Sequence, residues 1–246
     1  HRQRRRLGPG ARAAHDTKSS DVDPVTEFDR ATEELVVERL RSERPDDSIV
    51  GEEGTDHQGT SDLEWHIDPI DGTVNFSRGM PDWAISIACS DGNAITHGVI
   101  HAPDLNLTAW AIKGQGCFIN GRQITFGNAI PLSPIVALGY SDRSSLTDYL
   151  GRIERLLGAG IEHRRHGAAT ICFLGVLAGW FDAFYEPALN IWDAAAGVLL
   201  VNEAGGSVSH DLLESFLVRP SDVLAQNNQS ANIAAILESD KKARKT

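Results

Sequence analysis

The segment 65-WHIDPIDGTVNF-76 places two aspartates, Asp68 and Asp71, three residues apart at the start of a turn. The residues before Asp68 are typical of a strand, and a proline and a glycine then interrupt it. A short helix starting at Gly72 would point free backbone N–H groups outward, where the helix dipole favours an anion. Two carboxylates beside an anion-binding turn indicate a site that holds a metal and a phosphate together.

Acids elsewhere in the chain extend this interpretation. Glu52 and Glu53 lie between two glycines, and Asp193 lies between a tryptophan and the run AAAGVLL. Each acid also has a simpler explanation, as a solvated loop charge, a turn residue or, for Asp193, a helix cap. However, an unpaired buried carboxylate is costly, and no Lys or Arg lies close in sequence to Asp68, Asp71 or Asp193. Oxygen ligands without Cys or His favour Mg²⁺ or Mn²⁺ over zinc.

The overall composition argues against several classes of protein. No apolar run is long enough to cross a membrane, and the net charge of −11 argues against a protein that coats nucleic acid. A local exception is the arginine-rich segment 1–12, which is either a solvated terminus or a contact for an anionic partner. The isolated cysteines Cys89, Cys117 and Cys172 indicate neither a disulfide framework nor a zinc site. We therefore expect a reducing, cytoplasmic setting and no membrane association.

The order of the predicted elements indicates an α+β fold. Short strands joined by tight turns predict an antiparallel meander in the first half, and strands and helices alternate after about residue 128. We expect an N-terminal α+β subdomain, 1–128, with the antiparallel sheet and most metal ligands, and a C-terminal α/β subdomain, 129–246, with Asp193 and the specificity residues. The predicted strands are 65–67, 85–89, 95–101, 107–112, 117–125, 135–140, 183–185 and 223–225, and the predicted helices are 26–44, 144–157, 168–178, 191–204 and 230–239.

Spaced motifs, in a fixed order, resemble the inositol monophosphatase family of Mg²⁺-dependent, lithium-sensitive phosphatases. The motifs are DPVTEFD at 23–29, GEE at 51–53, DPIDGT at 68–73, WDAAAG at 192–197 and AGG at 204–206. The resemblance extends from about residue 18 to residue 228. It implies a layered αβαβα sandwich of the inositol monophosphatase/fructose-1,6-bisphosphatase type and, since dimers are common in the family, a homodimer.

The resemblance also implies a role for each carboxylate. Glu52, Asp68 and the backbone carbonyl of Ile70 would hold a first Mg²⁺, and Asp68, Asp71 and Asp193 a second. Glu52 with water ligands would hold a third, weaker ion, and Mn²⁺ could replace Mg²⁺. Asp68 would bind both of these cations, and their positive charge would offset the repulsion between Asp68 and Asp71.

In the mechanism that the resemblance implies, a water made acidic by the cations attacks phosphorus in line. Glu52 and Thr73 would orient and deprotonate this water, with Asp29 hydrogen-bonded to Thr73. The backbone amides of Gly72 and Thr73 would hold the phosphate. Asp29 has a second interpretation, because Thr26 and Asp29 have the spacing of a capping box at a helix start.

For the alcohol half of the substrate, Glu186 and Asp193 resemble acids that accept hydrogen bonds from hydroxyl groups, with Asp71 and the loop Gly167-Ala168-Ala169 nearby. The expected substrate is a small polyol phosphate, with inositol 1-phosphate first and histidinol phosphate, fructose 1,6-bisphosphate or a nucleotide 3′-phosphate as alternatives. A non-enzymatic role in binding RNA or protein is the other alternative. Substrate choice is expected to depend on residues 140–143, 164–169 and 185–190.

Overall fold

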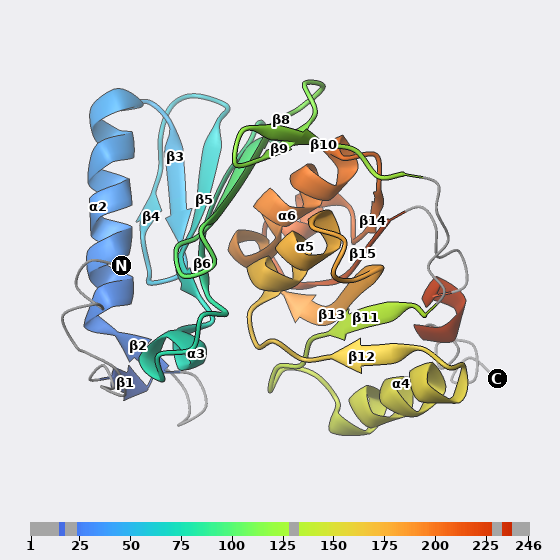
Figure 1. The fold of residues 1–246 in the computed structure, drawn as a ribbon. Helices are drawn as coiled ribbons and strands as arrows, with labels where there is room; N and C mark the ends of the chain where they lie inside the picture. Colours follow the sequence, from blue (N-terminus) through green and yellow to red (C-terminus); the bar gives the residue numbers. More distant parts are fainter. Residues whose placement is uncertain (1–14, 18–23, 128–132, 228–232, 238–246) are drawn as a thin grey trace.

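The computed structural model describes residues 15–17, 24–127, 133–227 and 233–237. Within these ranges two sheets alternate with helices in five layers (Figure 1). Helix α2 (Glu27–Glu43) covers the outer face of the first sheet, and α4 (Leu146–Gly158) covers the outer face of the second. Helices α5 (Ala169–Leu177) and α6 (Ile191–Glu203) lie between the sheets. The predicted α+β fold in an αβαβα arrangement is confirmed.

The first sheet has eight strands in the order β10-β9-β8-β7-β6-β5-β3-β4. From β5 to β10 successive strands pair antiparallel, as the predicted meander requires, whereas β3 pairs parallel with β5. The predicted β-rich segment 117–125 forms two strands, because its turn signal Asn120-Gly121 adopts φ values of 49° and 80° and turns the chain back between β9 and β10. The bounds are β3 Ser48–Gly51, β4 Asp56–His57, β5 Glu64–Asp71, β6 Ala84–Ser90, β7 Ile95–Ala102, β8 Leu107–Ile112, β9 Cys117–Ile119 and β10 Arg122–Ile124.

The second sheet has five strands in the order β12-β11-β13-β15-β14. Strand β11 pairs parallel with both β12 and β13, and β15 pairs antiparallel with β13 and β14. Strand β13 is longer than predicted, and its pairing with β15 shifts between Glu186 and Leu189, where Ala188 has a φ of 58°. The bounds are β11 Ile135–Leu138, β12 Glu162–Arg164, β13 Ala183–Leu189, β14 Ser207–Ser209 and β15 Ser221–Gln226, with a separate ladder of β1 His15–Thr17 and β2 Pro24–Thr26.

Some short elements were not predicted. Strands β3, β4, β12 and β14 contain two to four residues each, which is too few to show an alternating pattern. Helix α7 (Leu213–Phe216) is equally short, whereas the predicted turn of helix after Gly72 is present as α3 (Thr73–Ser77).

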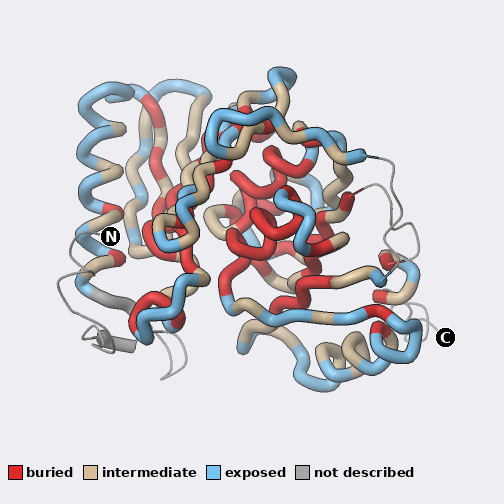
Figure 2. Tube along the Cα trace, viewed as in Figure 1, coloured by how far each residue is buried: buried red, intermediate tan, exposed pale blue. Residues whose placement is uncertain are grey.

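The central helices form the core of the molecule. Every residue of α5 is buried, and most of α6 is buried too, in the interior that Figure 2 shows in red. Two glycines permit this close packing. A Cβ at Gly197 would clash with the ring of Phe173 on α5, and a Cβ at Gly98 on β7 would lie 3.0 Å from the Cα of Ala196. Close contact on both sides fixes the position of α6, whose first turn carries Asp193.

Several predictions fall partly or wholly outside the described residues. The arginine-rich segment 1–12 and the predicted domain boundary at 128/129 lie outside them, and the two-domain division remains a prediction. Of the predicted helix 230–239, residues 233–237 are described and helical. None of the helices in the described ranges combines the length and the apolar character that a membrane span requires.

Candidate active site

The two aspartates of the opening segment lie at the end of β5. Residues three apart on a regular strand point to opposite faces of the sheet. Here the pairing of β5 with β6 shifts between Asp68 and Asp71, so the strict alternation is broken at Pro69 and Ile70. Gly72 then adopts a left-handed φ of 86° and starts α3. The local irregularity explains how both aspartates can line one pocket.

Carboxylates from three separate elements converge beside this turn. Glu52 follows β3, Asp68 lies on β5, and Asp193 lies on α6. Each offers a carboxylate oxygen, and these oxygens lie within 4.8 Å of one another. An all-carboxylate donor set suits a hard divalent cation such as Mg²⁺. Mg²⁺ therefore fits this cluster.

Burial and mutual repulsion raise the pKa values of the aspartates. The pKa of Asp68 is raised well above its usual value by complete burial and then by Glu52, Asp71 and Asp193. The pKa of Asp71 is raised to about 6, mainly by burial, against the effect of hydrogen bonds from Thr170. No Lys or Arg in the described ranges forms an ion pair with Asp68 or Asp71. Both carboxylates thus need a cation to be stable in their charged form.

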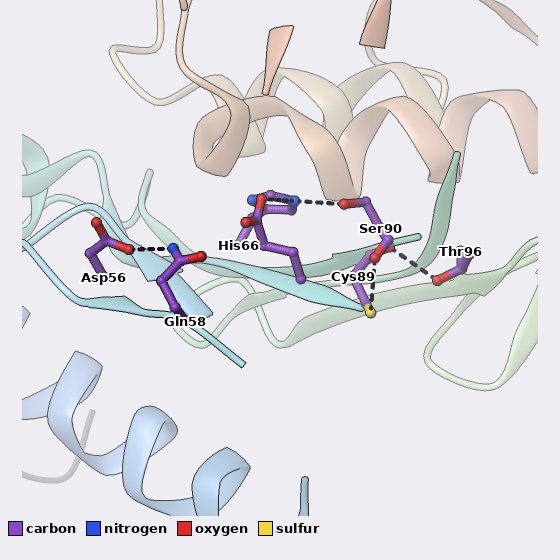
Figure 3. Close-up of polar contacts among 7 residues, drawn as sticks. Asp56, Gln58, His66, Cys89, Ser90 and Thr96 are labelled. Carbon is purple, nitrogen blue, oxygen red and sulfur yellow. Dashed lines mark hydrogen bonds and ion pairs between the residues drawn. The ribbon is translucent and has the colours of Figure 1, made fainter. Parts of the chain in front are cut away.

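His66, two residues before Asp68, does not supply this charge. Its ring is fully buried, with Nε2 3.0 Å from Ser90 Oγ on the neighbouring strand β6 (Figure 3). Burial lowers the pKa of His66 to about 4, so the imidazole is neutral at physiological pH. The sheet beneath the cluster is therefore uncharged at this position.

Asp193 has the neighbours that both of its interpretations require, and Asp29 has the contact with Thr73 that one of its interpretations requires. Thr73 Oγ1 lies 3.1 Å from Asp29 Oδ1 and 3.0 Å from the carbonyl oxygen of Ile70. Asp193 Oδ2 accepts a 3.0 Å hydrogen bond from the backbone N–H of Asn190 and so takes part in a capping box of α6. The predicted capping contact and the place in the acidic cluster thus coexist at Asp193. The side chain of Thr26, on which the capping box at Asp29 depends, lies outside the described residues.

Thr170 is a site residue that the sequence interpretation missed. Its backbone N–H and its hydroxyl donate hydrogen bonds of 2.6 and 2.5 Å to Asp71 Oδ2, across 99 residues of sequence. Thr170 is fully buried in the first turn of α5, directly after the loop Gly167-Ala168-Ala169. A threonine at a helix start after small residues was the available signal, but nothing local connected it to Asp71.

Glu33 was also missed, because it resembles a solvated charge on a helix. Its carboxylate is buried and accepts hydrogen bonds from Glu53 N at 2.8 Å, Thr55 N at 3.1 Å and Thr55 Oγ1 at 2.7 Å. The carboxylate also lies against Gly51, where a Cβ would clash with it. Glu33 of α2 therefore holds the loop that carries Glu52.

The acidic cluster opens into a pocket of about 490 Å³. Every predicted site residue except Asp29, which is buried behind Thr73, lines this pocket. The lining set is Glu52, Asp68, Ile70, Asp71, Gly72, Thr73, Gly167, Ala168, Ala169, Glu186 and Asp193.

The opposite wall of the pocket comes from the second sheet. Glu186 of β13 packs directly against Gly139, where a Cβ would clash with its carboxylate. Burial, and then the charges of Asp71 and Asp193, raise the pKa of Glu186 to about 8, while Arg165 and Arg143 favour its charged form. This is the region in which the sequence placed substrate choice.

The two walls are joined through Asn75 of α3. Its Nδ2 donates to the carbonyl oxygens of Asp82 at 2.7 Å and His166 at 2.8 Å. His166 Nδ1 also lies 3.2 Å from Asp82 Oδ1. A Cβ at Gly72 would lie 2.9 Å from the Cβ of Ala168, so the turn and the loop 167–169 need a glycine to pack this closely.

Comparison with known proteins identifies this arrangement. A family model described as the inositol monophosphatase family matches residues 3–242. This chain belongs to the inositol monophosphatase family. It is therefore a phosphomonoesterase, and the Mg²⁺ dependence of the family agrees with the acidic cluster.

Individual relatives of the family support the assignment. Over 205 residues the chain is 40% identical to a Pseudomonas aeruginosa protein named Nus factor SuhB, covering 78% of this chain and 76% of the relative. It is 39% identical over 193 residues to a fructose-1,6-bisphosphatase/inositol-1-monophosphatase of Thermotoga maritima, covering 78% of this chain and 73% of the relative. A solved Thermotoga maritima IMPase structure is 32% identical and superposes with a TM-score of 0.83, covering 98% of this chain and 95% of that one.

Proposed function

We propose that this chain hydrolyses a small polyol phosphate with the help of Mg²⁺, with inositol 1-phosphate as the first candidate substrate. The observation that carries the proposal is the convergence of Glu52, Asp68 and Asp193 within 4.8 Å, next to the turn at Gly72 that starts α3. When bound, Mg²⁺ ions would neutralise the phosphate and make an attacking water more acidic.

The chain's own groups would hold the ions in the way the resemblance implies. Glu52, Asp68 and the carbonyl of Ile70 would hold one ion, and Asp68, Asp71 and Asp193 another, with Glu52 contributing to a weaker third. The shift in pairing at the end of β5 supports this division, because it lets Asp68 and Asp71 share one pocket. Thr170 would keep Asp71 charged and oriented through its two hydrogen bonds.

Thr73 and Glu52 would position and deprotonate the attacking water. When Thr73 donates its proton to buried Asp29, its oxygen lone pairs can accept a hydrogen bond from water in the pocket. Glu52 would then accept the proton. The backbone amides of Gly72 and Thr73 would hold the phosphate oxygens, and Glu186 with Asp193 would accept hydrogen bonds from hydroxyl groups of the alcohol.

A panel of phosphate esters tests this proposal. The full chain is assayed for release of inorganic phosphate from inositol 1-phosphate, histidinol phosphate, fructose 1,6-bisphosphate and a nucleotide 3′-phosphate, with Mg²⁺ and with EDTA. We expect Mg²⁺-dependent release from at least the polyol phosphates. Absence of release from every ester, in a folded protein, would refute the proposal.

Further properties are expected from the resemblance to the family and, for the location, from the isolated cysteines. We expect inhibition by millimolar Li⁺, a homodimer in solution and a cytoplasmic location, with Mg²⁺ replaceable by Mn²⁺. The buried, unbridged state of Cys89, Cys117 and Cys172 is compatible with such a compartment. Li⁺ titration of the phosphatase assay and light scattering of the purified chain test the first two.

A contact role is the second candidate, because several relatives are named Nus factor SuhB. It is less favoured, since such a role does not require a carboxylate cluster that opens into a pocket. An Asp71→Asn variant separates the two. We expect it to fold and lose phosphate release, and a cellular role that survives in this variant would indicate function by contact.

A further inference from the structure

Asn75 of α3 connects two segments that are distant in sequence. Its Nδ2 donates a hydrogen bond of 2.7 Å to the carbonyl oxygen of Asp82 and one of 2.8 Å to that of His166, 91 residues away. The residue is buried, with 7% of its surface exposed. Because both partners are carbonyl oxygens, only the NH₂ group of the amide can bind them, and it uses both of its hydrogens.

A second contact crosses the same joint but is more exposed to water. His166 Nδ1 lies 3.2 Å from Asp82 Oδ1, and the rings of His166 and Phe181 have centroids 5.1 Å apart. The side chains of His166 and Asp82 are 26% and 25% exposed, so water competes for their contact. The buried amide of Asn75 is therefore the stronger tie between the two segments.

The segment that Asn75 holds leads directly to the acidic turn. After His166, Gly167 adopts a left-handed φ of 73°, and a Cβ there would lie 3.6 Å from Asn75 Nδ2. Three residues further on, the backbone N–H and hydroxyl of Thr170 donate hydrogen bonds to Asp71 Oδ2. A displacement of the chain at His166 would therefore move Thr170 away from Asp71.

Both ends of the Thr170–Asp71 contact lie close to Asn75 or to its partner. Asp71 lies four residues before Asn75, next to the turn that starts α3. Thr170 lies four residues after His166, in the first turn of α5. The two segments are tightly packed, because a Cβ at Gly72 would lie 2.9 Å from a side-chain atom of the loop before α5. Asn75 thus fixes the distance between the two segments whose groups meet at Asp71.

We propose that Asn75 is a positioning residue for phosphate hydrolysis, which acts by holding Thr170 against Asp71. The inference depends on the proposed function, in which Asp71 is a ligand of Mg²⁺. Asn75 itself is not part of the pocket wall, so its effect on the reaction must pass through the residues that it holds.

The Thr170–Asp71 contact can be tested without activity or metal. The chemical shift of the Thr170 amide proton is measured by NMR in EDTA, in the unaltered chain and in Asn75→Ala. A short N–H bond to a carboxylate moves this proton downfield, so we expect it to move upfield in the variant. The amide shifts of β6 should stay in place, which separates a local displacement from a general loss of structure.

A double-mutant cycle tests the effect on the reaction. The kcat for the best ester is measured at saturating Mg²⁺ in the unaltered chain, in Asn75→Ala, in Thr170→Val and in the double variant. We expect each single variant to lose about 10-fold in kcat. Because Asn75 acts through Thr170, the double variant should lose about 20-fold rather than the roughly 100-fold product of two independent effects.

Two further variants serve as controls. Ser77 is also buried on α3, but its Oγ donates a 2.9 Å hydrogen bond to Val74 O within the same helix. Ser77→Ala should therefore leave the Thr170 amide shift and kcat unchanged. Asn75→Ser keeps one donor on a shorter side chain, so it should show the same changes as Asn75→Ala at a smaller size. It provides the test if Asn75→Ala does not fold.

Each outcome decides the inference. A Thr170 amide shift that stays in place in a folded Asn75 variant overturns it. Losses of kcat that multiply in the double variant also overturn it, because Asn75 then acts by another route. If the unaltered chain hydrolyses none of the esters, the proposed function fails and Asn75 has no reaction to support. The Thr170 amide shift still shows, in that event, whether Asn75 holds the contact.

Discussion

Removal of the Glu33 carboxylate should weaken both the fold and the Mg²⁺ site. The carboxylate accepts three hydrogen bonds, from Glu53 N, Thr55 N and Thr55 Oγ1, at 2.7 to 3.1 Å. A hydrogen bond to a charged group contributes about 1.5–3 kcal/mol. Because the loop 51–55 is only partly buried, water can replace some of this. We expect Glu33→Ala to lower the free energy of unfolding by about 3 kcal/mol.

Glu33→Ala should impair Mg²⁺-dependent phosphate release more than its loss of stability alone would. Glu33 holds the loop on which Glu52 lies, so its loss should displace a ligand of the acidic cluster. Urea denaturation measures stability, and Mg²⁺ titration of phosphate release measures the site. We expect the Mg²⁺ concentration at half-maximal activity to rise about 10-fold, because a displaced carboxylate ligand loses on the order of 1.4 kcal/mol of binding free energy.

Two variants make this result interpretable. Glu34→Ala removes the exposed neighbour on the same helix and should change stability by less than about 0.5 kcal/mol. Glu33→Gln keeps the side-chain shape and one acceptor oxygen, so it should be intermediate. If Glu33→Ala is destabilised but its Mg²⁺ concentration at half-maximal activity is unchanged, Glu33 does not position Glu52, and our reasoning is refuted.

Three further predictions concern the pocket and the core. In the folded state the pKa values of Asp71 and Glu186 are raised to about 6 and 8, whereas their ordinary values are 3.8 and 4.5. The folded chain therefore holds protons on these two groups at pH values where the unfolded chain has released them. The free energy of unfolding without Mg²⁺ should therefore fall as pH rises from about 4 to 8, with Asp71 alone contributing a loss on the order of 3 kcal/mol. Bound Mg²⁺ should reverse this loss of stability. A melting temperature that rises with pH, measured by calorimetry in EDTA, would contradict the prediction. Gly197→Ala should lower the free energy of unfolding by about 3 kcal/mol, because the added methyl clashes with Phe173. Gly158→Ala should be tolerated, because a Cβ there meets no atom within 4 Å. Thermal unfolding of the two variants compares them. Thr170→Val removes one hydrogen bond to Asp71 and should lower kcat about 10-fold. It should also shift the acid limb of the pH–rate profile to higher pH, because that hydrogen bond lowers the pKa of Asp71. Thr170→Ser should restore kcat and the profile, and an unaltered pH profile in Thr170→Val would count against a role for this contact.

The sequence by itself determined the local pattern of the fold and the chemistry of the site. Short β-rich runs separated by tight-turn residues predicted the strands of the meander, because both signals belong to residues that are neighbours in sequence. The turn at 68–73 and the acids at 52 and 193 were predicted as site residues from the residues next to them in sequence. The largely apolar helices α5 and α6 were predicted in extent, but their apolar residues gave no indication of which neighbours cover them.

Only the tertiary structure decided which distant groups meet. Thr170 reaches Asp71 across 99 residues, and Glu33 reaches the loop of Glu52, through contacts that no local period encodes. The same holds for Asn75, which binds the carbonyl oxygen of His166 across 91 residues. Burial and mutual charge, which set the pKa values of the acids, also arise from packing. The residue types therefore specify which chemistry is available, and the close packing of two sheets around α5 and α6 specifies where it is assembled.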